Sequence, residues 1–155
     1  MSVEGGIEEP LRVERTFSAP IEAVFDAWLE VEVLKRWWPA GAGWTTPVAE
    51  VDARAGGRLR LVMRDPGGRH VGGHGRFVSI ARPHRLVFTW TWDEDDPGEP
   101  EQLVEVDFLA RSGATTQVVL TNRGLPDEGS KEAHRSGWQA SFENLDVALA
   151  ARRSA

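Results

Sequence analysis

The sequence predicts an α+β fold, in which a curved antiparallel sheet of about six to seven strands wraps around a long C-terminal helix. Two short helices are expected after the first strand. Three observations lead to this prediction. Apolar residues recur at helical spacing early in the chain and again at its end, and between these regions they alternate with polar residues in one short segment after another. The length of 155 residues suits one domain.

The chain is expected to begin with a tail and a strand. Residues 1–9 show no periodicity and contain a Gly-Gly pair, so we expect a flexible tail followed by a single domain over residues 10–153. Apolar and polar residues alternate over residues 11–17, which indicates a strand. Arg15 interrupts the apolar face of this strand.

Two short helices are predicted next. The Ser-Ala-Pro segment at residues 18–20 is a typical helix start, and an apolar stripe at helical spacing follows over residues 21–29. A second helix is expected to run through the Trp-Trp pair at residues 37–38, and Pro39 should end it.

Six strands are predicted in the middle of the chain, over residues 47–52, 58–64, 70–81, 86–92, 103–110 and 115–122. Turn residues separate them, and the Asp-Pro-Gly-Gly segment at 65–68 favours a hairpin. Three glycines within residues 72–75 indicate a bulge or a bend. The acidic, proline-containing stretch 93–101 predicts a solvated loop.

The last element shows the clearest helical pattern, over about residues 130–152. Its apolar or aromatic positions recur at intervals of four, four, three and four residues, at His134, Trp138, Phe142, Leu145 and Leu149. This stripe must cover the apolar face of the sheet. Where helix and sheet do not meet, the gap can become a pocket.

Charge and composition exclude several classes of function. The chain has 18 basic and 24 acidic residues, a net charge of −6, which suits neither nucleic acid nor an anionic membrane surface. No apolar run approaches the roughly 18 residues of a membrane span, and the start of the chain is acidic rather than signal-like. We therefore expect a soluble, cytoplasmic protein. Whether it is a monomer or a homodimer stays open.

The residues that could carry metal or acid–base chemistry do not form a convincing site. The chain has no cysteine. His70 and His74 lie on one predicted strand, about 13 Å apart at 3.3 Å per residue, too far to share an ion. The strand carboxylates at positions 50, 52, 105 and 107 alternate with apolar neighbours and should face solvent. We expect no metal, no cofactor and no assigned catalytic residue.

The residues that converge are mostly apolar. Inward-facing positions of the strands and of the last helix carry large side chains, and Asn122 is in phase with them as a polar group. A mostly apolar cavity with one or two polar groups is typical of a small-molecule site. The candidate ligand-binding residues are Trp38, Met63, Phe88, Trp90, Trp92, Phe108, Asn122, His134, Trp138 and Phe142.

The alternative is that these side chains fill the space completely, and the sequence leaves both possibilities open. Truncating two tryptophans of one predicted strand would distinguish a cavity from a filled core, because a cavity-lining residue and a core residue should differ in their contribution to stability. We expect Trp92, near the acidic loop, to line a cavity, and Trp90, deeper in the strand, to behave as packed core.

Several segments together resemble a known superfamily. They are FSAP at 17–20, WWP at 37–39, DARAGGRLR at 52–60, RLVFTW at 85–90 and HRSGWQASFENL at 134–145. In this order they resemble the START-like (SRPBCC) helix-grip superfamily, and within it the bacterial proteins similar to the activator of heat-shock protein 90 ATPase. The chain departs from its relatives at Asn122, where they often place a histidine.

The resemblance implies a helix-grip fold and leaves three functional hypotheses. The first is binding of a small hydrophobic or amphipathic molecule, such as a lipid, between the sheet and the C-terminal helix. The second is an interaction with a chaperone ATPase as its activator, which would connect the chain to a stress response. The third is a cyclase- or hydrolase-like enzyme that uses the same cavity, with Asn122 and His134 positioning the substrate. An enzyme is the less favoured reading, because no catalytic constellation is visible.

Overall fold

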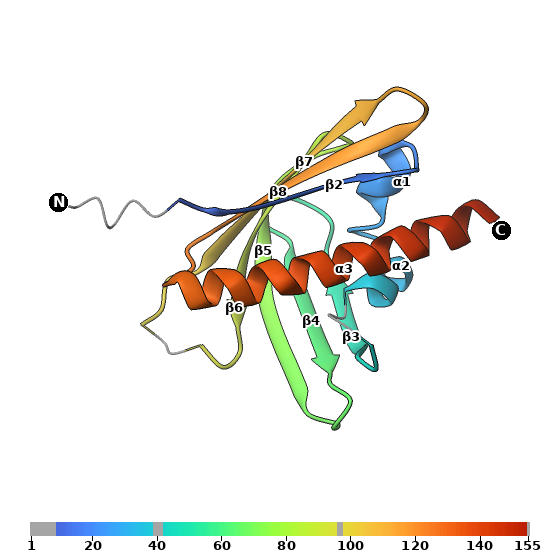
Figure 1. The fold of residues 1–155 in the computed structure, drawn as a ribbon. Helices are drawn as coiled ribbons and strands as arrows, with labels where there is room; N and C mark the ends of the chain where they lie inside the picture. The colour runs from blue at the N-terminus through green and yellow to red at the C-terminus, as the bar shows by residue number, and fades with distance from the viewer. Residues whose placement is uncertain (1–8, 39–41, 96–97, 155) are drawn as a thin grey trace.

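The computed structural model describes residues 9–38, 42–95 and 98–154 (Figure 1). The element order confirms the predicted α+β fold. Its elements are β2 (Leu11–Phe17), α1 (Ile21–Asp26), α2 (Val31–Trp37), β3 (Thr45–Val51), β4 (Arg58–Arg64), β5 (His70–Ala81), β6 (Arg85–Trp92), β7 (Gln102–Arg111), β8 (Thr115–Arg123) and α3 (Glu128–Ser154). Most of the predicted tail, residues 1–8, and the predicted helix stop at residue 39 lie outside the described residues.

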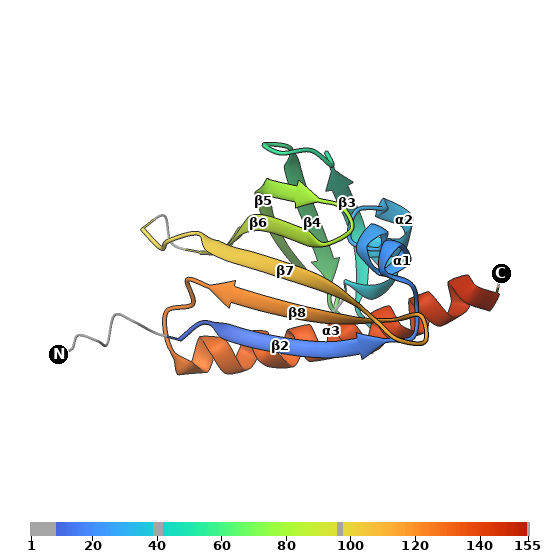
Figure 2. The same cartoon turned by 90° about the horizontal axis from the view of Figure 1, so that it is seen from above.

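The seven strands form one antiparallel sheet in the order β2-β8-β7-β6-β5-β4-β3. Apart from β2, neighbouring strands in the sheet are consecutive in the chain, as hairpins require. β2 pairs with β8, so that Leu11 lies opposite Asn122 and Phe17 opposite Thr116. Figure 2 shows the curvature of this sheet and the position of α3 along one of its faces.

α3 buries the apolar stripe that the sequence predicts. Phe142, Leu145 and Leu149 are almost fully enclosed, and Trp138 is buried as well. The charged residue on the inner face of β2 also has its partner on this helix, since Arg15 Nη2 lies 3.0 Å from Asp146 Oδ2. An ion pair with the covering helix therefore accounts for the interruption in the apolar pattern of β2.

Some boundaries differ from the prediction. α1 ends at Asp26, and Trp28 and Leu29 follow in a turn, where the backbone N–H of Leu29 donates to the carbonyl of Asp26. Their apolar side chains still face the core, which is why the helical spacing extends past the end of the helix. β3 begins at Thr45, and α3 begins at Glu128, each two residues before the predicted start.

The predicted bulge near the glycines of β5 is wrong in position. The register shift between β5 and β6 lies between Phe77 and Ser79, beyond the glycines. The glycines instead allow other groups to approach closely. A Cβ atom on Gly73 would lie 2.2 Å from Trp90 Cζ2, and one on Gly75 would lie 1.8 Å from the carbonyl oxygen of Thr89.

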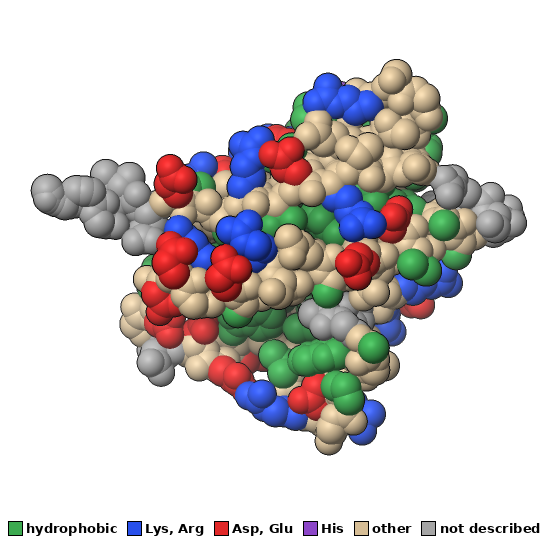
Figure 3. Space-filling model, in the orientation of Figure 1, with side chains coloured by type: hydrophobic (Ala, Val, Ile, Leu, Met, Phe, Trp, Pro, Cys, Tyr) green, Lys and Arg blue, Asp and Glu red, His purple; other side chains and the backbone are tan. Residues whose placement is uncertain are grey.

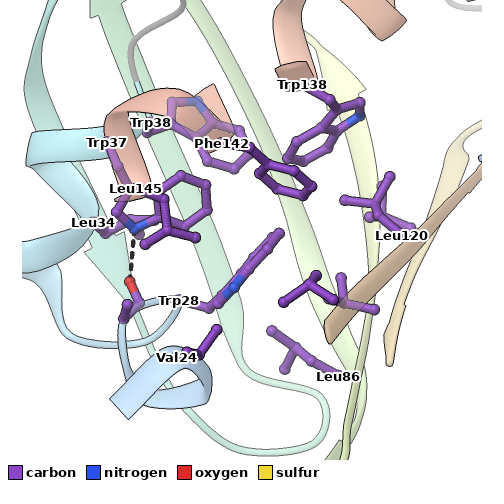
Figure 4. Packing of buried hydrophobic residues seen from close by; sticks show 14 of the residues in the cluster. Val24, Trp28, Leu34, Trp37, Trp38, Leu86, Leu120, Trp138, Phe142 and Leu145 are labelled. Carbon is purple, nitrogen blue, oxygen red and sulfur yellow. Dashed lines mark hydrogen bonds between the residues drawn. The ribbon is translucent and has the colours of Figure 1, made fainter. Parts of the chain in front are cut away.

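An aromatic cluster around Trp28 fills the space where α1 and α2 meet the sheet and α3 (Figure 4). The ring of Trp28 lies 4.7 Å from that of Trp37 and 6.0 Å from that of Trp138, measured between centroids. Trp37 Nε1 donates a hydrogen bond to the carbonyl of Ala27 at 2.9 Å. This half of the interface between sheet and α3 is packed solid.

None of the helices in the described part of the chain combines the length and the apolar character that a membrane crossing needs. α3, the longest, has charged and polar residues along its exposed face.

Candidate functional site

A cavity of about 270 Å³ lies between α3 and the inner face of the sheet, beside the packed aromatic cluster. Five of its lining side chains are tryptophans, and its wall is overwhelmingly apolar. Figure 3 shows hydrophobic side chains at the surface below α3, on the side of strands β4 to β6. The lining residues are Trp38, Trp44, Met63, Val71, Phe88, Trp90, Trp92, Gln102, Val104, Asn122, Ala133, His134, Gly137, Trp138 and Ser141.

Four tryptophans from three parts of the chain form a continuous aromatic wall. The ring of Trp90 on β6 lies 5.4 Å from Trp38, which follows α2, and 5.2 Å from Trp92. Trp38 in turn lies 5.5 Å from Trp138 of α3, nearly perpendicular to it. Two of these three contacts are edge-to-face and the Trp38–Trp90 contact is tilted, and together they hold each ring in place, so the wall is preformed.

A chain of hydrogen bonds forms the buried polar end of the cavity. Trp138 Nε1 donates to Asn122 Oδ1 at 3.0 Å, and Asn122 Nδ2 donates to Gln102 Oε1 at 3.1 Å. Asn122 and Gln102 lie on the neighbouring strands β8 and β7, and both side chains are buried. The asparagine thus joins helix and sheet as well as lining the cavity.

A second polar contact joins the sheet to the first turns of α3. Trp92 Nε1 donates to His134 Nε2 at 3.1 Å, and His134 Nδ1 lies 2.9 Å from the carbonyl oxygen of Ser130. Because an indole N–H can only donate, Nε2 must be the unprotonated nitrogen and Nδ1 must carry the hydrogen. Both ring nitrogens are therefore engaged in hydrogen bonds within the protein.

The structure places most of the predicted ligand-binding residues on this wall. The eight that line the cavity are Trp38, Met63, Phe88, Trp90, Trp92, Asn122, His134 and Trp138. Phe108 and Phe142 belong instead to the packed cluster, where their rings lie 6.2 Å from that of Trp28. Both were predicted to line the cavity because they face inward. The ring of Trp28 packs against them, so they do not border the cavity.

Trp90 and Trp92 differ less than expected. Trp92 is half-buried, and Trp90 is only 3% exposed, yet both border the cavity. Trp90 is packed on one side, against Gly73 of β5, and lines the cavity on another. It is therefore part of the wall, and it is not solid core alone.

Sequence reasoning missed several lining residues. Gln102 lies two residues before Val104, on the same face of β7, but the strand was predicted to begin only at residue 103. Ser141 is three residues after Trp138 on α3, and its hydroxyl donates to the carbonyl of Trp38 at 3.0 Å. Extending both periodic patterns by one step would have found these two residues. Trp44 and Gly137 carried no periodic signal.

The charged residues near the cavity form pairs outside it. Asp93 accepts hydrogen bonds from Arg60 at 3.0 Å and from His74 at 3.1 Å. Partial burial tends to raise the pKa of the Asp93 carboxyl, but these bonds and the charge of Arg60 outweigh it and lower the pKa. Glu105 pairs with Arg85 and Arg123, and Asp107 with Arg85. Among the described residues, no group of three or more potential ligands is placed to hold a metal ion.

Replacing Asn122 with leucine should destabilise the protein by about 2–4 kcal/mol. The change leaves the buried N–H of Trp138 and the oxygen of Gln102 without their hydrogen bonds to Asn122, and each orphaned group costs about 1–3 kcal/mol. Urea unfolding measures the loss. Gln117→Leu, on the same strand β8 but bonded to Glu14 and Arg111 outside this network, is the comparison, and an equally small effect of both changes would contradict the role given to Asn122.

Comparisons with known proteins agree with this architecture. The profile of the family described as "Activator of Hsp90 ATPase homolog 1-like protein" matches residues 18–150. The solved structure of the AHSA1 protein from Silicibacter pomeroyi is 28% identical, with a TM-score of 0.81 over 92% of this chain and 99% of that chain. A protein from Chromobacterium violaceum is 25% identical, with a TM-score of 0.80 over 92% and 98% of the two chains.

A more distant similarity concerns the fold alone. An HSP90 activator from Plasmodium falciparum is 24% identical, with a TM-score of 0.72 over 92% of this chain and 97% of that chain. Among curated proteins, no sequence matches significantly.

Proposed function

This chain belongs to the activator of Hsp90 ATPase homolog 1-like family, which has the START-like helix-grip fold, and on that premise we propose that it binds a small hydrophobic or amphipathic molecule. The ligand occupies the cavity between the sheet and α3. The observation that carries the proposal is the cavity itself, about 270 Å³ in volume and lined by five tryptophans with the Asn122–Gln102 amides at its polar end.

The size and chemistry of the cavity favour a ligand over a packing defect. Interiors of proteins are normally packed as tightly as organic crystals, and their voids seldom exceed a water molecule. This cavity is far larger, and it combines an apolar wall with a few fixed polar groups, as small-molecule sites do. Its rings are held by contacts with each other, so binding need not order them.

Tryptophan fluorescence tests this proposal directly, because five of the seven tryptophans line the cavity. Titration with a library of lipids and neutral aromatic compounds should give a saturable change in emission for at least one member. Indole and fatty-acid-sized compounds bracket the range of sizes. Absence of a saturable response to every compound, confirmed by NMR titration, would refute the proposal.

Alanine at the two tryptophans of β6 tests which of them supports the fold. Trp90→Ala should cost about 3–5 kcal/mol of stability, the usual range for a buried Trp truncation, because the ring is enclosed. Trp92→Ala should cost less, because its ring is only partly buried and already borders a space. Thermal unfolding and ligand titration of both variants make the comparison. Equal and large losses of stability would contradict a preformed cavity at this end of the sheet.

A second candidate function rests on the family match over residues 18–150. It is activation of a chaperone ATPase, the activity that the name of the family contains. Addition of the chain to a bacterial Hsp90 should then raise the rate of ATP hydrolysis. An unchanged rate at saturating chain concentration would dismiss this candidate and leave ligand binding unaffected.

The enzyme hypothesis has less support. It relied on His134 as the acid or base, and the hydrogen bonds to Trp92 and Ser130 engage both ring nitrogens. The hydroxyl of Ser141, which also lines the cavity, donates to a backbone carbonyl. We therefore propose binding without a chemical step.

A further inference from the structure

We infer that the cavity selects neutral, two-ring-sized aromatic molecules that carry a hydrogen-bond acceptor such as a ketone oxygen. This inference rests on the proposed function and specifies the class of ligand. Three properties of the wall carry it: the direction of its hydrogen-bond chain, the absence of charge among its described lining residues, and its volume.

The direction of the hydrogen-bond chain is fixed at one end by Trp138. Its indole N–H can only donate, so Asn122 must present its oxygen to Trp138 and its nitrogen to Gln102. Gln102 must then present its oxygen to Asn122. The usual ambiguity between the oxygen and nitrogen of an amide therefore does not arise here.

The chain ends in an unused donor. Among the described residues, the amide nitrogen of Gln102 has no hydrogen-bond partner, and the side chain lines the cavity while being only 6% exposed. The nearby acceptors each already take a hydrogen bond from the protein: Asn122 Oδ1 takes the N–H of Trp138, and His134 Nε2 takes that of Trp92. A ligand that offers an acceptor to Gln102 completes the chain, whereas one without an acceptor leaves this donor desolvated and unpaired.

The charge of the ligand follows from the lining residues. None of those in the described part of the chain is Asp, Glu, Lys or Arg, and both ring nitrogens of His134 are engaged in hydrogen bonds within the protein. An ion in this cavity would lose its hydration without gaining a counter-charge, which is costly. The wall therefore favours a neutral ligand.

The size follows from the volume. An apolar cavity of about 150 Å³ holds one benzene ring. The present cavity of about 270 Å³ is nearly twice as large, enough for two fused rings. The tryptophan faces and edges around it suit flat rings, which stack on or abut the indoles.

Three matched probes test the inference: 1-tetralone, which has a ketone oxygen; tetralin, the corresponding hydrocarbon; and tetralin-2-carboxylate, an anion. NMR titration of the full chain should show 1-tetralone binding about three- to tenfold more tightly than tetralin, the range expected for one hydrogen bond. The anion should bind most weakly. Gln102→Met keeps the length of the side chain and removes both the donor and the oxygen that accepts from Asn122, and it should abolish the preference for the ketone.

Gln117→Met is the matched control. Gln117 is on β8 and bonds to Glu14 and Arg111, away from the cavity, so this variant should keep the preference for 1-tetralone. Equal affinities of the wild type for 1-tetralone and tetralin, a preference that survives Gln102→Met, or tightest binding of the anion would each overturn the inference and leave the proposed function standing. Failure of the wild type to bind any of the three probes would overturn the inference, whereas the proposed function falls only if the wider library of lipids and aromatic compounds also gives no response. If Gln102→Met does not fold, the wild-type order of affinities decides.

Discussion

Replacing Gly137 with leucine should weaken ligand binding by roughly 10- to 100-fold without destabilising the fold. Gly137 lies on α3 and lines the cavity, and a Cβ atom added there would meet no other atom within 4 Å. A leucine side chain would thus enter free space and take the room of one ligand ring. Losing the burial of one ring costs about 1.5–3 kcal/mol, which corresponds to that change in affinity.

The fold should tolerate this change because leucine is a better helix former than glycine, by about 0.8 kcal/mol in a helix interior. The dissociation constant of 1-tetralone and the midpoint of thermal unfolding are measured for wild type and variant. Gly137→Ala serves as the control, since it brings the same gain in helix propensity and fills little of the cavity. Wild-type affinity in Gly137→Leu would show that ligands bind elsewhere.

Replacing Gly73 with alanine should destabilise the protein by about 3 kcal/mol. The added Cβ atom would lie 2.2 Å from Trp90 Cζ2 and 3.0 Å from the backbone oxygen of Thr91. Trp90 cannot retreat easily, because its ring packs against Trp38 and Trp92. Overpacking of a well-packed site typically costs 1–3 kcal/mol, and a contact this short between a strand and an enclosed ring belongs at the upper end.

Urea unfolding of Gly73→Ala and Gly137→Ala gives a direct comparison of the same substitution at two walls of one cavity. The first should be destabilised and the second slightly stabilised, so the two variants should differ in sign. A destabilisation below about 1 kcal/mol in Gly73→Ala would mean that the Trp90 ring moves freely into the cavity, and the aromatic wall would not be preformed.

The regular elements could be predicted from the sequence because their signals are local. Residues 58–64 alternate strictly, and β4 begins and ends at those residues. The stripe from His134 to Leu149 identified α3 and its buried face. Each pattern arises because one face of a single segment packs against the apolar core. It can therefore be recognised without knowing which elements are its neighbours. The hairpin order followed from the turn residues in the same way.

The exact ends of the helices and strands were harder to predict from the sequence. α1 stops at Asp26 although apolar residues continue at helical spacing, because the turn after it also directs Trp28 into the core. The glycines of β5 signalled close approach in general, and the sequence could not say whether they accommodate a bulge or the ring of Trp90. That choice depends on a side chain of the neighbouring strand.

The sequence by itself determined the fold class, the inward-facing aromatic set and the place of Asn122 among it. Only the tertiary structure decided which of these residues border a space, since it assigned Trp90 to the cavity wall and Phe108 to the packed cluster. It also brought Gln102 into contact with Asn122 from another strand. The reason is physical. The periodicity of a segment shows which way its side chains point. A cavity is the volume that the side chains of several elements leave unfilled, so it cannot be read from any single segment.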